Sequence, residues 1–356
     1  MERTSYFEAD EHDLIGSRAD LHEPGMNTKL TLPNGIELKF GQIIALGGDF
    51  YGVSNNPIID INTDDTGSEE NQRRRERFLA AYATLATKEF NANETNQLNT
   101  LVTMFNEEKA VRASGEGELH SHSEYGAASP NMLSLAIKNY DHFQPQAKQA
   151  YLVGHQLAME KARVAARDTN VENKKKKLME AYSLDAFAGH YLTDCFSSGH
   201  IRTPRVQLYK QLWIPLNGDY LSKYMHDEDS KFGLRVKNNK NTKWIAYGDG
   251  YLLKNGSQDN LQKVVQAVQK SVDQVHEAYQ HPDREINTDV VTDLLPFVDP
   301  DAENNTPLFQ MKDGELHMRS ETDDLQSTGT TSDWTGAGAV LSLVGHDPEN
   351  SALPSA

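Results

Sequence analysis

Cysteine is almost absent from this sequence: Cys195 is the only one among 356 residues. A single thiol cannot form an intrachain disulfide, so the fold gives no sign of depending on an oxidising compartment. No stretch approaches about 18 consecutive apolar residues, and no membrane span is expected. The first residues, MERTSYFEADEHDLIG, lack the basic-then-apolar order of a signal peptide. We therefore expect a protein of the cytoplasm, or one exported by a route that needs no signal peptide, as a secreted virulence effector would be.

Positive charge is also scarce, with 35 Lys and Arg against 52 Asp and Glu, which gives a net charge of −17. A polyanion would be repelled on average, so nucleic acid is not the expected partner. Apolar residues make up 37% of the chain, but they recur at regular spacings, which indicates a folded protein rather than a disordered one.

Helical periodicity dominates the middle of the chain. We expect helices over about 6–21, 68–90, 94–113, 130–140, 144–168, 173–197 and 257–280. Two β-prone runs flank the turn at 33–35, a strand and turn are expected over 243–253, a hairpin is expected over 307–320, and residues 227–240 are expected to be irregular. The sequence therefore predicts a mainly α, multi-helix fold with small β elements. The predicted units are a helical catalytic domain over 1–285, a mixed extension over 286–325 and a flexible tail over 326–356.

The segment HYLTDCFSSGH at 190–200 places three polar groups in an otherwise apolar helix. His190 and Asp194 are four residues apart, so they share one helix face and can chelate one ion, while His200 lies just past the helix. An isolated His-x-x-x-Asp pair is more often a buried pair that satisfies itself, and this alternative stays open on spacing alone. Cys195 points away from that face and is expected to be a core thiol.

Other histidines and one aspartate stand in similar settings. His12 lies in EHDLIG, Asp49 in LGGDFYG, His142 in YDHFQP and His226 in KYMHDEDS. Imidazole and carboxylate together suit zinc or another first-row divalent ion.

The segment AYSLDAFAGHYLTDCFSSGH resembles the metal-binding helix of the bacterial zinc-dependent phospholipases C, which are relatives of the zinc single-strand nucleases. That family has a helical HYL-x-D followed by a histidine six residues after the aspartate, which is the spacing of His190, Asp194 and His200. Further similarities in the same order point to His12 in the N-terminal helix, to Asp49 in a loop like the family's ADY loop, and to His142 in its HF loop. Together these motifs cover roughly residues 5–235.

The sequence departs from the family pattern in its metal ligands, as well as in a missing signal peptide, a long insert between the Asp49 and His142 motifs and a long C-terminal extension. Secreted members begin, once processed, with a tryptophan that binds one zinc, whereas the first tryptophan here is Trp213, so a third site is absent or is completed differently. The family's last ligands form a His-x-x-x-Glu pair, but the residue four after His226 is Ser230. The last carboxylate ligand is therefore expected to be Asp229, or otherwise Asp227.

The resemblance implies a zinc phospholipase C-like bundle that hydrolyses phosphatidylcholine or phosphatidylglycerol at a membrane surface to diacylglycerol and a phosphorylated head group. One ion is expected on Asp49, His142, His190 and Asp194, and another on His200, His226 and Asp229, with His12 and Asp194 as candidates for a third. Asp49 is the expected catalytic base, and Arg202 or Arg205 would bind the phosphate unless it forms a surface salt bridge. The alternatives are a zinc single-strand nuclease or 3′-nucleotidase, and a non-catalytic interaction module stabilised by metal.

Overall fold

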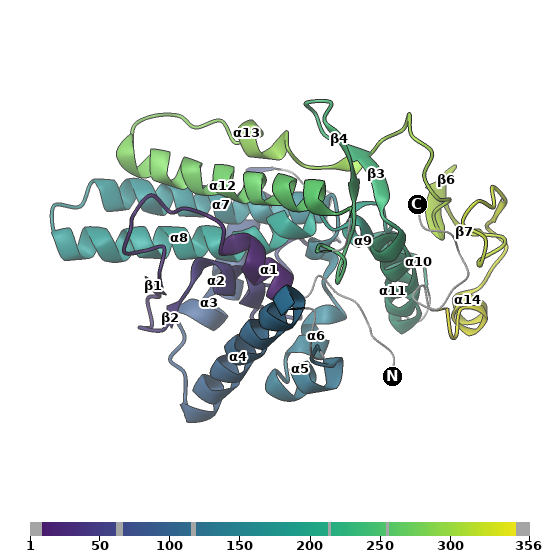
Figure 1. The fold of residues 1–356 in the computed structure, drawn as a ribbon, viewed down its shortest axis with the longest axis horizontal. Coiled ribbons are helices and arrows are strands. Elements are labelled where there is room, and N and C mark those ends of the chain that lie inside the picture. The colour runs from purple at the N-terminus through teal and green to yellow at the C-terminus, as the bar shows by residue number, and fades with distance from the viewer. Residues whose placement is uncertain (1–8, 62–66, 115–118, 213–214, 254–255, 347–356) are drawn as a thin grey trace.

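The computed structural model describes residues 9–61, 67–114, 119–212, 215–253 and 256–346, and its chain is mainly helical (Figure 1), which confirms the predicted fold class. The helices of the first half are α1 (Ala9–Gly16), α2 (Phe40–Leu46), α3 (Ser68–Ala86), α4 (Ala92–Ser114), α5 (His122–Ala128), α6 (Met132–Ala136), the 3₁₀ turn η1 (Tyr140–His142) and α7 (Gln146–Ala166). The later helices are α8 (Val171–Asp194), α9 (Ser198–Ile201), α10 (Arg205–Gln211), α11 (Pro215–Phe232), α12 (Gln258–Gln280), α13 (Asp289–Thr292) and α14 (Gly336–Ser342). No helix among the described residues is long and apolar enough to cross a membrane.

The strands are short and form three small antiparallel sheets within the described residues. They are β1 (Leu30–Thr31) with β2 (Glu37–Leu38), then β4 (Lys243–Ala246), β3 (Leu234–Lys237) and β5 (Phe297–Val298) in that order, and finally β6 (Phe309–Lys312), β7 (Glu315–Arg319) and β8 (Thr330–Thr331). The predicted hairpin near residue 310 is the β6–β7 pair, in which Phe309 faces Met318.

The main core lies between α7, α8 and α12, which run side by side (Figure 1). α8 begins at Asn170, whose side chain accepts the N–H of Asn173 at 3.0 Å and caps the helix. From Ala181 to Asp194 every residue of α8 is buried, so this half of the helix has no solvent face. α12 is amphipathic instead, and its valines at 264, 268, 272 and 275 are all buried against the other two helices. The core thus encloses the end of α8 that carries His190 and Asp194.

A buried polar network also joins these three helices. Nδ1 of His155 on α7 lies 2.7 Å from Oδ1 of Asp185 on α8, and Nε2 lies 2.9 Å from the Gln274 amide oxygen on α12. Ser271 of α12 donates to the same aspartate oxygen at 2.8 Å and accepts from the Tyr151 hydroxyl at 2.9 Å. Because these groups are hydrogen-bonded to one another across three helices in a region without solvent, we interpret them as a structural network that fixes the register of the bundle.

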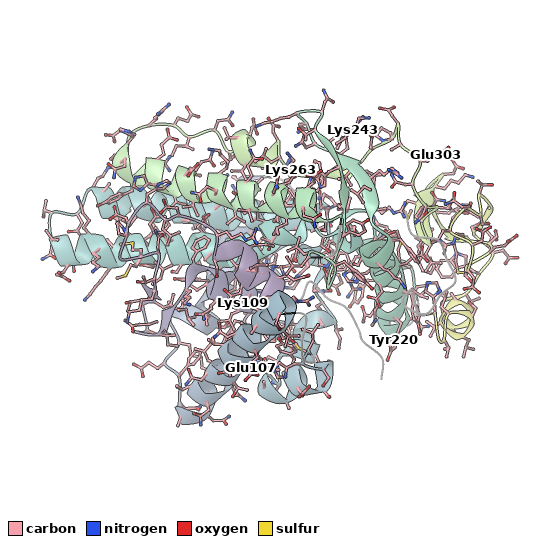
Figure 2. The ribbon with its side chains drawn as sticks, viewed as in Figure 1. Glu107, Lys109, Tyr220, Lys243, Lys263 and Glu303 are labelled. Atoms are coloured by element: carbon pink, nitrogen blue, oxygen red, sulfur yellow. The ribbon has the colours of Figure 1, made fainter. Side chains whose placement is uncertain are left out.

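The short helix α1 packs against α2 and α4 beneath this bundle. Gly16 and Gly41 make the close approach of α1 to α2 possible, since a Cβ on Gly16 would lie 2.5 Å from the Gly41 Cα. Lys109 of α4, labelled in Figure 2, forms an ion pair with the buried carboxylate of Asp13 on α1. These contacts fix the position of α1, most of whose side chains are buried.

A smaller second core joins the C-terminal residues to α10 and α11. It contains buried apolar side chains from both parts, namely Leu208, Leu221, Met225, Leu308, Phe309, Leu316, Ala339 and Leu343. Its polar centre is the fully buried pair of Arg319 and Glu228, with two contacts of 2.8 Å. Strand β5, which falls in the expected mixed extension, pairs instead with β3. Residues 330–346, which fall in the expected flexible tail, contain β8 and α14; the tail's last residues, 347–356, lie outside the described residues.

The predicted hairpin about residues 33–35 is present as β1 and β2, in which Leu30 faces Leu38. Two local predictions were nevertheless wrong in extent, and burial is the common reason. The second β-prone run continues after β2 as helix α2, whose seven residues are all buried and whose Gln42 side chain accepts the N–H of Lys39 at 2.9 Å. Residues 227–240, expected to be irregular because they are polar, form the end of α11 and strand β3. Their polar side chains Glu228 and Asp229 are buried and paired, so a polar composition did not indicate a loop here.

Candidate metal centre

Eight imidazole and carboxylate groups converge where the bundle meets α1 and α11. They come from eight positions in seven segments: His12 (α1), Asp49 (the loop after α2), His142 (η1), His190 and Asp194 (α8), His200 (α9), His226 (α11) and Asp249 (the loop after β4). All except Asp49 are buried, and the Asp49 side chain is 26% exposed. Burying this many polar groups is costly unless something satisfies them.

Asp194 lies at the middle of this set, and its two oxygens face different imidazoles. Oδ2 is 3.0 Å from Nδ1 of His142 and 3.5 Å from Nε2 of His190. Oδ1 is 3.6 Å from Nε2 of His12 and 3.7 Å from Nδ1 of His200. Nδ1 of His200 is held by the His142 carbonyl, so the nitrogen atoms open to an ion are those of His142 and His190 on the Oδ2 side and Nε2 of His12 on the Oδ1 side. This is the geometry of a carboxylate placed to bridge two ions.

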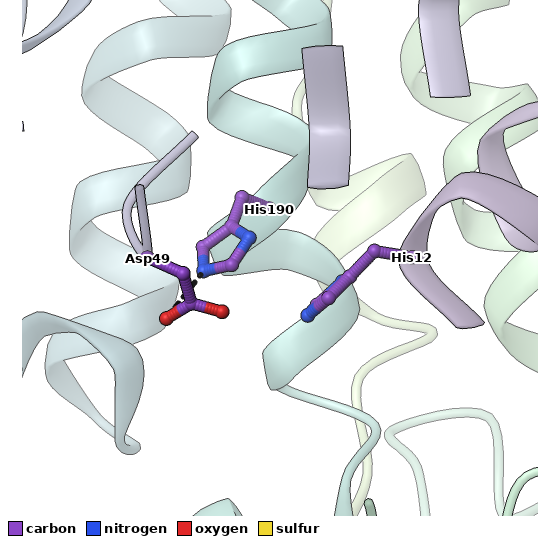
Figure 3. Close-up of side chains that lie close together, drawn as sticks. All are labelled: His12, Asp49 and His190. Carbon is purple, nitrogen blue, oxygen red and sulfur yellow. Dashed lines mark ion pairs between the residues drawn. The ribbon is translucent and has the colours of Figure 1, made fainter. Parts of the chain in front are cut away.

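Asp49 approaches the same imidazoles from the outer side. Its Oδ1 is 3.7 Å from Nδ1 of His142 and 3.8 Å from Nε2 of His190. Figure 3 shows His190 between Asp49, which comes from a loop, and His12, which comes from α1; these three residues form one group that could hold an ion. The loop can come this close because residue 48 is a glycine with φ +76°. A Cβ at this position would lie 2.5 Å from Cδ2 of His190.

A separate group consists of His200, His226 and Asp249. Oδ2 of Asp249 is 2.9 Å from Nε2 of His226 and 3.8 Å from Nε2 of His200. Its other oxygen accepts a hydrogen bond from the Ser197 hydroxyl at 2.7 Å, which fixes the carboxylate. Gly199 allows α9 to pack directly on His226, since a Cβ there would lie 2.5 Å from Cδ2 of that ring.

Four of the five imidazoles are oriented by a contact at their Nδ1 atoms. The partners are the Thr193 hydroxyl for His12 (2.7 Å), the Ile44 carbonyl for His190 (3.0 Å), the His142 carbonyl for His200 (2.8 Å) and the Asp227 carboxylate for His226 (3.0 Å). A carbonyl accepts only from a protonated nitrogen, so Nε2 of His190 and of His200 is left as the lone-pair nitrogen that faces the neighbouring carboxylates. Metal-binding histidines are commonly held in this way.

Burial and neighbouring charge move the pKa values of the imidazoles in opposite directions. Burial lowers the pKa of His12 and of His200 to about 3, and it holds the pKa of His190 well below its usual value. Burial also acts on His142, but Asp194 outweighs it and raises the pKa of that ring to about 9. For His226, Asp249 outweighs burial and raises the pKa to about 10. The rings of His12, His190 and His200 are thus neutral, as a metal-binding imidazole must be. The rings of His142 and His226 take up protons because neighbouring carboxylates stabilise their charged form.

The carboxylates themselves are poorly compensated. Burial raises the pKa of Asp194 to about 7 and that of Asp49 to about 6. Oδ2 of Asp194 and Oδ2 of Asp249 are buried, and neither accepts a hydrogen bond from any described residue, although each lies close to an imidazole nitrogen. A cation among these atoms would satisfy both oxygens, and the mixed nitrogen and oxygen donors fit zinc or a similar first-row ion.

The structure brings together most of the residues selected from the sequence. His142, His190 and Asp194 form one group that could hold an ion, and Asp49 lies 3.7–3.8 Å from both of these histidines. His200 and His226 meet at a second position. His12 lies close to both Asp194 and His190, and the ring centroids of His12 and His190 are 4.5 Å apart.

Asp229 and Arg202 are placed elsewhere, and they must be reassigned. Nη2 of Arg202 is 2.7 Å from Oδ1 of Asp229, and Nε is 2.9 Å from Oδ2, so the two side chains occupy each other. The alternative ligand Asp227 contacts the outer nitrogen of His226 and supports it from behind. The alternative phosphate-binding residue Arg205 pairs with Asp219 at 2.7 Å.

Sequence reasoning missed Asp249, which takes the position expected for Asp229. It lies in YGDGYLL, where a strand ends and two glycines enclose the aspartate. The segment GGDFYG around Asp49 has the same character, an aspartate in a glycine-rich turn after a buried element. That shared context is the signal in the sequence that points to Asp249.

Comparisons with models of protein families, with curated proteins and with solved structures each found no match to this chain.

Proposed function

We propose that this protein is a metal-dependent phospholipase C that hydrolyses glycerophospholipids such as phosphatidylcholine and phosphatidylglycerol. The observation that carries the proposal is the position of Asp194, whose Oδ2 faces His142 and His190 at 3.0–3.5 Å while its Oδ1 faces Nε2 of His12 at 3.6 Å. A carboxylate in this position is suited to bridge adjacent divalent ions. Clusters of such ions a few ångströms apart are typical of enzymes that cleave phosphate esters.

The ligand sets follow from the distances. His142, His190, Asp194 and Asp49 would hold one ion, and His200, His226 and Asp249 would hold another. His12 with Asp49 and His190 offers a third position, and Oδ1 of Asp194 would bridge to it, since it lies 3.6 Å from Nε2 of His12. Structural zinc sites are usually closed and rich in cysteine, whereas this set contains none and keeps one partly exposed carboxylate, Asp49, at its edge. These features favour an open site of the catalytic kind.

The bound ions would supply positive charge that polarises the phosphodiester and makes an attacking water more acidic. Asp49 is the residue that meets solvent, so its carboxylate is placed to orient that water and accept its proton. The water oxygen forms a new bond to phosphorus, and the bond between phosphorus and the diacylglycerol oxygen breaks. The proton taken from water returns to the leaving oxygen, so the products are diacylglycerol and a phosphorylated head group.

The test is an assay of the full chain on vesicles of phosphatidylcholine and, separately, phosphatidylglycerol. We expect diacylglycerol release in the presence of zinc, loss of release after chelation and recovery when the metal is restored. Release that survives chelation, or that never appears with metal bound, would contradict the proposal. His190→Ala should abolish release with the fold retained by circular dichroism, because its ring serves two of the three ligand groups.

A second function, single-strand nuclease or 3′-nucleotidase, is favoured by a pair of aromatic rings near Asp49. Tyr51 and Phe90 stack with ring centroids 5.8 Å apart and planes 13° from parallel. They line a cavity of about 150 Å³ that also includes Phe50 and Leu101. Bases of single-stranded nucleic acid stack on such rings. The net charge of −17 weighs against this alternative.

The two functions and the non-catalytic alternative give different results. A nuclease would cleave a single-stranded oligonucleotide under the same metal conditions and leave the vesicles intact, and Tyr51→Ala would raise its KM. A structural metal site would instead give an inactive protein that unfolds in His190→Ala or after chelation. Measuring the metal content by emission spectroscopy alongside each assay separates loss of metal from loss of chemistry.

A further inference from the structure

Glu11 is a fully buried acidic residue on α1 that points toward the Asp249 loop rather than toward the imidazoles. Its Oε2 accepts the backbone N–H of Gly250 at 3.0 Å, and its Oε1 accepts the backbone N–H of Leu252 at 3.0 Å. Both carboxylate oxygens are therefore engaged by one short stretch of backbone. Gly250 follows Asp249 directly and Leu252 lies three residues after it, and we assign Asp249 to the second group of metal ligands.

Other contacts among the described residues also hold the loop that carries Asp249, including the hydrogen bond from the Ser197 hydroxyl to Oδ1 of Asp249 at 2.7 Å. The N–H of Gly248 donates to the Ser230 carbonyl of α11 at 3.1 Å, and the N–H of Tyr251 donates to Gly248 within the loop at 3.0 Å. Asp249 thus lies between a support from α11, which also carries His226, and a support from α1. Arg112 of α4 adds to the second support, because its guanidinium pairs with Asp10 and lies 3.5 Å from the Gly250 carbonyl.

We infer that Glu11 is a positioning residue that holds the Asp249 carboxylate where His200 and His226 can share a metal ion with it. The inference rests on the metal binding proposed above. A shift of the loop by about 1 Å would take Oδ2 of Asp249 out of reach of a shared ion, because ligand distances in such sites tolerate only a few tenths of an ångström. The next residue of α1, His12, belongs to the group with Asp49 and His190. One turn of α1 therefore contributes to two of the ligand groups.

The chemistry of the contact explains why a carboxylate is needed. Two N–H groups point at one side chain, and only a carboxylate offers an acceptor to each. In Glu11→Gln the amide NH₂ would face one of the two N–H groups, so one hydrogen bond is replaced by a contact between donors. Asp13 is the matched control: it is a buried carboxylate on the same helix, and its recorded partners are Ser17 and Lys109, not the loop.

The first experiment measures amide hydrogen exchange by NMR in the metal-free full chain. We expect the Gly250 and Leu252 amides to exchange at least tenfold faster in Glu11→Gln than in the wild type, and within about twofold of the wild type in Asp13→Asn. Amides of α8 serve as the internal reference for global opening. Unchanged exchange of both loop amides in a folded Glu11→Gln protein overturns the inference, and this result does not depend on whether the protein binds metal.

The second experiment measures zinc occupancy in crystals by anomalous scattering, over a series of zinc concentrations. In Glu11→Gln the group of His200, His226 and Asp249 should need at least tenfold more zinc for half occupancy, while the group around Asp194 fills as in the wild type. An equal loss at both groups would indicate a general structural role and overturn the inference. A wild-type protein that takes up no zinc would instead overturn the proposed function.

Discussion

Arg202 and Asp229 hold each other in a two-point salt bridge, with contacts of 2.7 and 2.9 Å. The same guanidinium donates to the Asn305 carbonyl at 2.8 Å, so it joins the end of α9 to α11 and to the C-terminal residues. Both side chains are buried or nearly so, and each satisfies the other. The salt bridge therefore serves the fold, and it leaves Asp249 as the carboxylate that completes the second metal group.

This reassignment predicts different effects for two conservative variants. Asp249→Asn should lower zinc content by one ion per chain and reduce phospholipid hydrolysis by at least about 100-fold, because a ligand worth several kcal/mol of charge stabilisation is lost. Asp229→Asn should keep full zinc content and instead lower the midpoint of thermal unfolding, since a buried guanidinium loses its partner. Metal analysis and calorimetry on both proteins check this, and loss of zinc in Asp229→Asn alone would contradict the assignment.

The sequence was sufficient where local spacing determines geometry. His190 and Asp194 are four residues apart on a helix, so their convergence follows from helical geometry, and α12 follows equally from its stripe of valines. The ligands from distant segments, Asp49 and His142, were found through a family resemblance. Physical spacing alone could not have joined them, because 93 residues of sequence separate them.

The sequence was insufficient where a tertiary contact decides between equal candidates. Within KYMHDEDS, three acidic residues follow His226, and nothing local indicates that Glu228 pairs with Arg319 while Asp229 pairs with Arg202. Arg319 and Arg202 lie on other elements, so the sequence around His226 does not indicate that the carboxylates of Glu228 and Asp229 are already paired. The true candidate ligand, Asp249, lies 23 residues beyond His226, on a loop that reaches the site only through the chain reversal of β3 and β4.

The glycine at position 48 gives a test of the Asp49 loop. Gly48→Ala should reduce zinc affinity and activity together, because its φ of +76° disfavours a side chain and the new Cβ would lie 2.5 Å from His190 and 2.8 Å from His142. Isothermal titration with zinc gives the affinity. Gly126→Ala is the control, since a Cβ there has no neighbour within 4 Å. A Gly48→Ala protein with wild-type zinc affinity would show that the loop can move away without loss of the site.

Asp49 itself allows binding and chemistry to be separated. Asp49→Asn keeps the size of the side chain and one metal-binding oxygen but cannot accept a proton, so activity should fall by about 10²–10⁴-fold. Zinc content should fall by less than one ion per chain, because His142, His190 and Asp194 remain. The fall should appear in kcat rather than KM, as measured on mixed micelles of phosphatidylcholine. An activity within threefold of the wild type would remove Asp49 from its assigned role.

The buried pair of Glu228 and Arg319 predicts how acid affects the C-terminal residues. Burial alone would raise the pKa of Glu228, but hydrogen bonds from His346 and Arg319 outweigh it and lower that pKa below its usual value. A lowered pKa in the folded state means that the pair stabilises the fold at neutral pH and loses this contribution as the pH falls below about 4. Urea unfolding between pH 3 and 7 should therefore show a decline in the wild type. Glu228→Gln should be less stable at pH 7 and less sensitive to acid, whereas equal pH profiles for the two proteins would contradict the prediction.

Asp194 gives the sharpest prediction, because its two oxygens face imidazoles on opposite sides. Asp194→Asn retains one oxygen acceptor but replaces the other with an NH₂ donor that no metal binds. Whichever way the amide turns, one side must lose its ligand: the side of His142 and His190, or the side of His12. We therefore expect zinc content to fall by more than the single ion lost in Asp249→Asn, with activity reduced to background. The double variant Asp194→Asn/Asp249→Asn should lose little more activity than Asp194→Asn alone, since residues that act as one unit are not additive. Zinc content equal to that of the wild type in Asp194→Asn would mean that the carboxylate is only a hydrogen-bonding partner of the histidines, and the bridging assignment would fail.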